Sequence, residues 1–220
     1  MQSEFIKKLL RIRQQVDSEM ILLLSPVVTR MPLPIRRYDD PFLPFGKAII
    51  QATHDLVCGY CFDVPAYLAI GAAGAIALER TLSYVAGERL TILHGPFAGP
   101  AFARLTDENA FDSDAVTLID AANLSAYLYR PDRSAFVSVT GTPEAAYVDA
   151  LCRQGGIFWA RAAEGDGHLS YGRFVTMTPT GTLVTLWLAG EEVLYAASGD
   201  DFTEHVRNAL MAMKVNLSNG

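Results

Sequence analysis

Three side chains that could do acid–base or nucleophilic chemistry lie at the ends of two predicted strands. Cys61 and Asp63 close an apolar run over residues 56–62, and His94 follows a second run over residues 90–93. His94 and Asp63 could act as a general acid and base, with Cys61 as a nucleophile. We favour the alternative, a hydrogen-bonded histidine without a catalytic role, because no nucleophile or metal partner is spaced near His94 in the sequence.

The segment Cys58-Gly-Tyr-Cys61 is a C-x-x-C pair, which could indicate redox chemistry. In a thioredoxin-like site the pair opens a helix, whose dipole lowers the pKa of the first thiol. Here the pair falls within or just at the end of a strand, where residues three apart face opposite sides. We therefore expect two packed cysteines. No second C-x-x-C is present to complete a structural zinc site, and we predict neither a metal nor a cofactor.

The elements that must position these residues alternate between strands and helices. Such alternation predicts right-handed βαβ units and a parallel sheet, the α/β class. An N-terminal helical region covers residues 1–18, with the helix itself over 4–16. Residues 26–46 contain five prolines and predict a Pro-rich surface loop. The other predicted strands are 20–24, 115–119, 135–139 and 157–160, and the other helices are 47–55, 65–85, 143–152 and 201–214.

The last third of the chain breaks this alternation. Only Pro179, Thr180 and Gly181 separate two apolar runs over residues 173–178 and 182–187. A parallel crossover needs about a dozen residues, so these runs predict a β-hairpin. Residues 164–167 predict another turn without a following helix. We therefore expect one α/β barrel-like domain over residues 1–220, with a shortened C-terminal third.

Composition narrows the function classes. The chain has 220 residues, half of them hydrophobic, and a net charge of −6, which argues against a nucleic-acid surface. The basic residues Lys7, Lys8, Arg11 and Arg13 predict one solvated helix face. No apolar run is long enough to span a membrane, and three cysteines are too few for a disulfide scaffold. We expect no nucleic-acid or membrane partner and a cytoplasmic location.

Two blocks of the chain resemble orotidine 5'-phosphate decarboxylase, the enzyme that makes UMP. One begins at Asp40-Pro41-Phe42, runs through residues 45–60 and continues to Leu78-Glu79; the other is residues 193–202. Weaker matches are residues 114–117 and 140–143. The resemblance implies a TIM-barrel-like fold and, since the family is dimeric, a homodimer.

The family's charged residues are missing at the positions that the resemblance assigns to them. The family's Asp-x-Lys-x-x-Asp motif after strand three falls on His94, Pro96 and Gly99. That lysine gives a proton to the carbanion formed by decarboxylation and the charges around it hold the geometry, and proline has no ionisable group to do so. The base-contacting positions fall on Thr140, Gly141 and Thr142.

Three further positions have also changed. The resemblance puts Ser25 in place of a nucleoside-contacting aspartate, Cys61 in place of a lysine, and Glu191 in place of the phosphate-binding arginine. A phosphate dianion needs cationic or backbone donors, so Glu191 should repel it. Loss of every charged group together fits loss of the reaction.

These observations predict a non-catalytic homologue that acts through protein association or through binding of a small ligand. The alternative is a different enzyme, such as a lyase, that uses the barrel opening around His94 and Asp63. Retained decarboxylation of orotidine 5'-phosphate is the interpretation that we favour least. The predicted pocket is lined by Ser25, Cys61, His94, Pro96, Gly99, Thr140, Gly141, Thr142 and Glu191.

Overall fold

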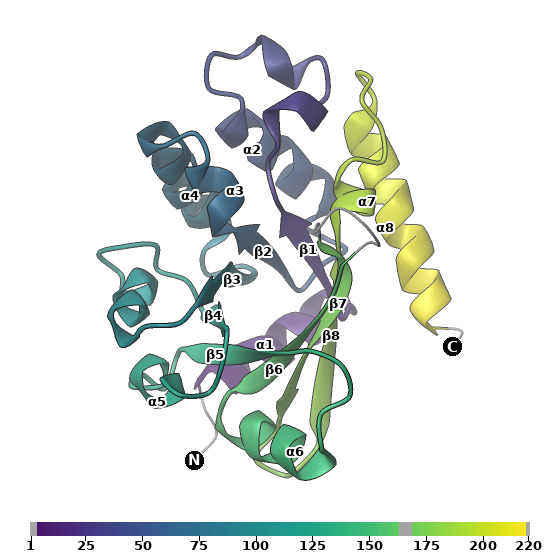
Figure 1. Cartoon of the computed structure of the whole chain (residues 1–220). Coiled ribbons are helices and arrows are strands. Elements are labelled where there is room, and N and C mark those ends of the chain that lie inside the picture. Colours follow the sequence, from purple (N-terminus) through teal and green to yellow (C-terminus); the bar gives the residue numbers. More distant parts are fainter. Residues whose placement is uncertain (1–3, 163–168, 219–220) are drawn as a thin grey trace.

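The computed structural model describes residues 4–162 and 169–218, which form a closed eight-stranded barrel with helices around it (Figure 1). This confirms the predicted α/β barrel. The turn predicted over residues 164–167 lies outside the described residues. The strands are β1 (Met20–Leu24), β2 (Gly59–Asp63), β3 (Leu90–Phe97), β4 (Ala115–Leu118), β5 (Ser134–Val139), β6 (Gly156–Ala162), β7 (Leu169–Met177) and β8 (Leu183–Ala189).

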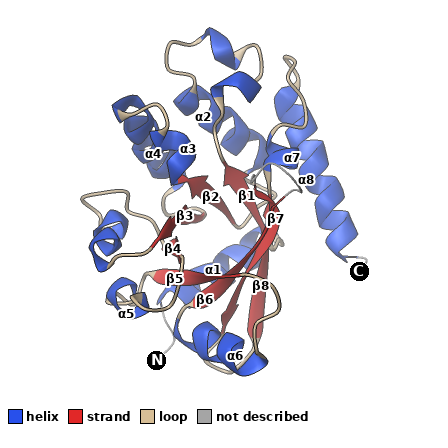
Figure 2. Cartoon of the chain, viewed as in Figure 1, coloured by secondary structure: helices blue, strands red, loops and turns tan. Residues whose placement is uncertain are grey.

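Strand direction changes in the last third, as the short connections require. Strands β1 to β6 pair in parallel, β7 is antiparallel to both β6 and β8, and β8 closes the barrel by pairing in parallel with β1. The predicted hairpin is therefore β7–β8. Within the described residues no helix lies between β6 and β8 in the chain (Figure 2), so these connections add no crossover helix of the kind found in a parallel barrel. Helix α6, from the β5–β6 connection, packs against both β6 and β7.

The helices differ in what they cover. They are α1 (Glu4–Val16), α2 (Phe42–Thr53), α3 (Val64–Leu68), α4 (Ala72–Val85), α5 (Leu124–Tyr127), α6 (Ala145–Gln154), α7 (Glu191–Leu194) and α8 (Phe202–Ser218), with 3-10 turns η1 (Val28–Arg30), η2 (Ile35–Arg37) and η3 (Pro100–Thr106). Helix α1 closes the N-terminal end of the barrel, because Phe5, Leu9 and Ile12 pack with the side chains of the barrel interior. No helix among the described residues is long and apolar enough to cross a membrane.

Two of the predicted elements have wrong boundaries for a clear backbone reason. The Pro-rich loop predicted over 26–46 ends at Pro41, because α2 begins at Phe42 instead of residue 47. Pro44 lies in the first turn of α2, where a missing N–H costs no intrahelical bond. The single helix predicted over 65–85 is two helices, α3 and α4. They are separated at Gly71, whose φ of +70° lies in the left-handed region that favours glycine.

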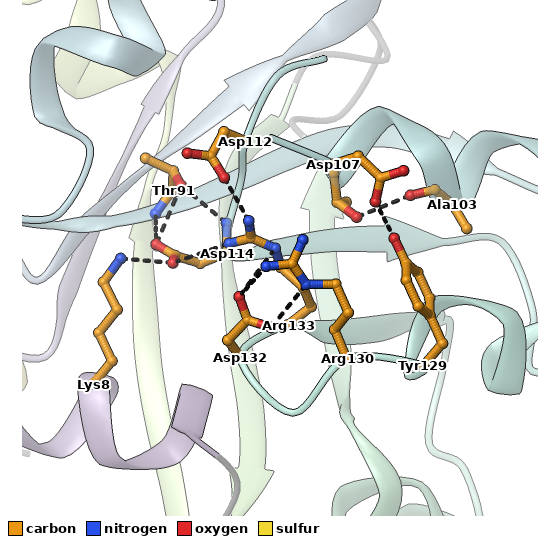
Figure 3. A network of polar contacts seen from close by, with 11 residues as sticks. Lys8, Thr91, Ala103, Asp107, Asp112, Asp114, Tyr129, Arg130, Asp132 and Arg133 are labelled. Atoms are coloured by element: carbon orange, nitrogen blue, oxygen red, sulfur yellow. Dashed lines mark hydrogen bonds and ion pairs between the residues drawn. The ribbon is translucent and has the colours of Figure 1, made fainter. Parts of the chain in front are cut away.

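The basic face predicted on α1 is only partly solvated. Lys8 Nζ lies 2.6 Å from Oδ1 of Asp114, which directly precedes β4 and is 4% exposed (Figure 3). Asp114 Oδ2 also accepts hydrogen bonds from the backbone N–H of Thr91 at 2.9 Å and from its hydroxyl at 3.2 Å. Arg133 Nη1 lies 3.8 Å from the same carboxylate. Lys8 therefore ties α1 to the base of β3 and β4.

Candidate functional site

His94 lies inside the barrel, on a strand that is longer than predicted. Strand β3 continues to Phe97, and its pairing with β4 shifts register between Leu93 and Phe97. Because side chains alternate along a strand, His94 points to the same side as the interior residue Ile92. Its Nδ1 is 3.0 Å from the Thr117 hydroxyl, and its ring meets the Phe158 ring edge-on with centroids 5.3 Å apart.

Asp63 and His94 are neighbours, as the sequence predicts for an acid–base pair. They stand opposite each other in the parallel register of β2 and β3. Burial lowers the pKa of His94 from its ordinary value near 6.5, and the attraction of the Asp63 carboxylate opposes that shift. The imidazole is therefore neutral at neutral pH and has one nitrogen able to accept a proton.

Both oxygens of the Asp63 carboxylate accept hydrogen bonds from other parts of the chain. Its Oδ1 caps α3 by accepting the N–H of Ala66 at 3.2 Å, and its Oδ2 accepts the Ser25 hydroxyl at 2.8 Å. Ser25 follows β1 and is 2% exposed. Both oxygens of Asp63 thus have hydrogen-bond donors from the chain itself, so the carboxylate holds β1, β2 and α3 together at the C-terminal end of the barrel.

Glu191 joins this cluster from the start of α7 and is 5% exposed. Its Oε1 is 3.5 Å from the Ser25 hydroxyl, which has one proton and donates it to the closer Asp63. Its Oε2 forms an ion pair with Nη1 of Arg30, which comes from η1. A buried carboxylate normally requires such a partner, and for Glu191 the Pro-rich segment supplies that cation.

Tyr195 completes the cluster. The Arg30 guanidinium lies over its ring, 4.2 Å from the centroid. The Tyr195 hydroxyl donates to the Ser25 carbonyl and accepts the N–H of Val27, both at 2.7 Å. Burial raises the pKa of this phenol, so it remains a donor. Ser25, Arg30, Asp63, Glu191 and Tyr195 therefore form one internally bonded group, which we call the Ser25 cluster.

Cys61 is in the interior below this cluster and is poorly suited to act as a nucleophile. It has no exposed surface, and burial raises the pKa of its thiol well above the ordinary value. The prediction that Cys58 and Cys61 face opposite sides was wrong. Cys58 precedes β2, so strand alternation does not apply to it, and both free thiols pack in the interior cluster.

The remaining predicted residues lie outside the Ser25 cluster. Pro96 is in β3, and Gly99 precedes η3, where its carbonyl accepts the Tyr127 hydroxyl at 2.7 Å. Residues 140–142 are exposed on the connection from β5 to α6. Gly141 and Thr142 line a pocket with Trp159, Arg173 and Trp187 of β6, β7 and β8. The structure therefore divides the predicted pocket into a buried polar group and a surface group.

Sequence reasoning missed Arg30, Thr117 and Tyr195. Arg30 lies in a segment assigned to a surface loop, and nothing local to it signals a partner 161 residues away. Thr117 had a usable signal, since it alternates with buried Ala115 and therefore faces the interior beside His94. In the described part of the chain, no group of three or more His, Cys, Asp and Glu side chains is arranged to hold a metal ion.

Comparison with known proteins finds orotidine 5'-phosphate decarboxylases among the relatives of this chain. The chain is 33% identical over 153 residues to orotidine 5'-phosphate decarboxylase of Thermomicrobium roseum, covering 64% of this chain and 54% of the relative. It is 30% identical over 142 residues to the enzyme of the same name from Herpetosiphon aurantiacus, covering 60% and 52%. The chain therefore spans about half the length of the curated relatives it matches. No family model matches it.

Solved structures of orotidine 5'-monophosphate decarboxylases share the fold of this chain. Orotidine 5'-monophosphate decarboxylase of Plasmodium berghei superposes with a TM-score of 0.53 at 16% identity, covering 66% of this chain and 63% of that one. The OMP decarboxylase of Leishmania donovani gives a TM-score of 0.52 at 18% identity, covering 65% and 56%. At these identities the structures support the barrel fold alone.

Proposed function

We propose that this chain, which is homologous to the orotidine 5'-phosphate decarboxylases, does not decarboxylate orotidine 5'-phosphate and acts by association with protein, as a homodimer or with another partner, or by binding a small ligand. The observation that carries the proposal is Glu191. A buried carboxylate stands at the position that the resemblance gives to the phosphate-binding arginine, and it is paired with Arg30 inside the chain.

The Ser25 cluster supports this proposal by its charge. A phosphate dianion at this end of the barrel would approach two carboxylates, Asp63 and Glu191, that lie on either side of the Ser25 hydroxyl. The nearby cation, Arg30, is neutralised by Glu191 and packed on Tyr195. Binding a phosphate here would compete with Glu191 for Arg30 and bring a dianion beside a buried carboxylate, which is electrostatically unfavourable.

The side chains at the end of strand β3 also support the proposal that the chain does not decarboxylate orotidine 5'-phosphate. Its irregular end, from His94 to Phe97, carries histidine, glycine, proline and phenylalanine, so it offers no ammonium group to a carbanion. The one ionisable side chain of that stretch, His94, is held between Thr117 and Phe158.

Calorimetric titration with UMP tests the proposal directly. We expect no saturable heat for the purified chain, and no loss of orotidine 5'-phosphate when its absorbance is followed over hours. A decarboxylase homologue that retains the lysine and arginine serves as the positive control for both measurements. Micromolar binding of UMP by this chain would show that the phosphate site persists and would overturn the proposal.

A second candidate is a different enzyme, and the register of Asp63 against His94 favours it. A neutral imidazole beside a carboxylate can accept a proton from a substrate. A thermal-shift screen of metabolites tests this function. It predicts a ligand whose stabilisation disappears in His94→Ala and persists in the matched control His205→Ala, since His205 is exposed on α8. Equal stabilisation of both variants would contradict it.

A further inference from the structure

The outer face of the antiparallel strands carries a row of two tryptophans and an arginine. Trp159 on β6 is opposite Arg173 on β7, and Arg173 is opposite Trp187 on β8. Their sequence neighbours Phe158 and Phe174 stack inside the barrel with ring centroids 4.4 Å apart. Alternation along the strands therefore directs the row outward, on strands whose connections to one another contain no helix among the described residues.

These three side chains line a pocket. Its volume is about 660 Å³, within the range of small-molecule sites, and Gly141 and Thr142 form the rim next to them. That rim belongs to the connection from β5 to α6, which arcs past the three antiparallel strands (Figure 1). The pocket therefore has two walls, a sheet face and a loop, and lies apart from the Ser25 cluster.

Arg173 is held in place within the pocket, and none of the acidic side chains that the structure describes is its partner. Its guanidinium carbon lies 4.4 Å from the centroid of the Trp159 ring, a stacked arrangement that occupies the flat face of the group and leaves its N–H edge free to donate. No carboxylate of the described residues forms an ion pair with it. Arg207, by comparison, is bound on both sides of its fork by Asp55.

We propose that this pocket binds a small aromatic carboxylate, whose carboxylate pairs with the N–H edge of Arg173 while its ring lies against an indole face. The guanidinium fork matches a carboxylate in two parallel hydrogen bonds, and stacking of an aromatic ring on indole adds affinity beyond the area buried. A binding site on the outside of the barrel stands whether or not the barrel interior has lost the decarboxylation reaction.

The chain has a built-in reporter for this pocket, because its two tryptophans, Trp159 and Trp187, both line it. Titration with benzoate, followed by tryptophan fluorescence and repeated by calorimetry, tests the proposal. We expect a saturable change with benzoate. Acetate, which lacks the ring, and benzyl alcohol, which lacks the charge, should each bind at least about tenfold more weakly, the equivalent of one lost contact of about 1.4 kcal/mol.

Variants separate this site from a general surface effect. Arg173→Gln should weaken benzoate binding by at least about tenfold, and Arg173→Lys should weaken it too, since an ammonium lacks the planar fork. The matched control is Arg153→Gln, because Arg153 is an exposed arginine of the neighbouring α6 that pairs with Asp149. Its affinity for benzoate should equal that of the unchanged chain. Circular dichroism of each variant establishes that the fold is retained.

Three outcomes would overturn the proposal. The first is the absence of a saturable signal with benzoate in the unchanged chain. The second is unchanged benzoate affinity in a folded Arg173→Gln variant. The third is inorganic phosphate that binds as tightly as benzoate and displaces it, which would show a general anion site without selection for a planar carboxylate.

Discussion

His94 shows how burial of a single residue sets a measurable pH dependence. Its neutral form is favoured in the folded chain, because burial lowers the pKa of the imidazole below its ordinary value near 6.5. As the pH falls through about 6.5, His94 becomes protonated in the unfolded chain but stays neutral in the folded chain. Stability should therefore fall with decreasing pH from this point, by at most about 1.4 kcal/mol per pH unit for one proton.

Urea unfolding between about pH 7 and pH 5 measures this slope, in a window above the titration of ordinary carboxylates. His94→Gln should flatten it, because glutamine does not titrate. The matched control His205→Gln changes an exposed histidine of α8 and should leave the slope as it is. A slope that survives in His94→Gln would assign it to another group and contradict the neutral state of the partly buried His94.

The sequence predicted the individual residues of the site unevenly. Asp63 and His94 were found because both follow strands, and adjacent parallel strands bring their ends together. Glu191 was found through resemblance, but its partner Arg30 was not, since the ion pair depends on how the Pro-rich segment folds back over the barrel. Cys61 was expected to be a packed cysteine, and its full burial confirms this. Its role as a nucleophile stayed open in the alternative hypothesis, because pattern alone does not give the depth of a side chain.

At the scale of elements, the link between α1 and the barrel depends on Asp114. Its buried carboxylate joins Lys8 of α1 to the backbone and hydroxyl of Thr91 (Figure 3). Asp114→Ala leaves these donors unpaired and should cost about 3 to 5 kcal/mol of unfolding free energy, as expected when one partner of a buried pair is removed. Chemical denaturation provides the measurement.

The control for Asp114 is Asp149→Ala, which removes an exposed ion pair between successive turns of α6. That change should cost no more than about 0.5 kcal/mol. Similar costs for the two variants would mean that Lys8 is solvated and that α1 is held by its apolar face alone. The sequence predicted α1 itself from its periodicity, whereas the contact with Asp114 joins residues 106 positions apart and is not visible in local pattern.

At the scale of the whole molecule, the C-terminal third of the chain, with its antiparallel strand β7, is part of the barrel. The sequence predicted the β7–β8 hairpin from its three-residue turn, yet local pattern did not show whether these strands would close the sheet. The structure closes it through β8 and β1. Phe174 of β7 lies between Phe158 and Phe136, with ring centroids 4.4 Å and 5.0 Å away, so the interior is shared by parallel and antiparallel strands.

A shared interior predicts that the chain unfolds as one cooperative unit. Phe174→Ala should lower the unfolding free energy by about 3 to 5 kcal/mol, while Leu183→Ala, at a position 54% exposed on β8, should change it by less than about 0.5 kcal/mol. Tryptophan fluorescence reports on β6 and β8, and far-ultraviolet circular dichroism reports on all the helices. Both transitions should move together in Phe174→Ala, because coincident probes are the mark of a two-state transition. A fluorescence transition that precedes the loss of helix would instead show that β6 to β8 form a separately unfolding unit.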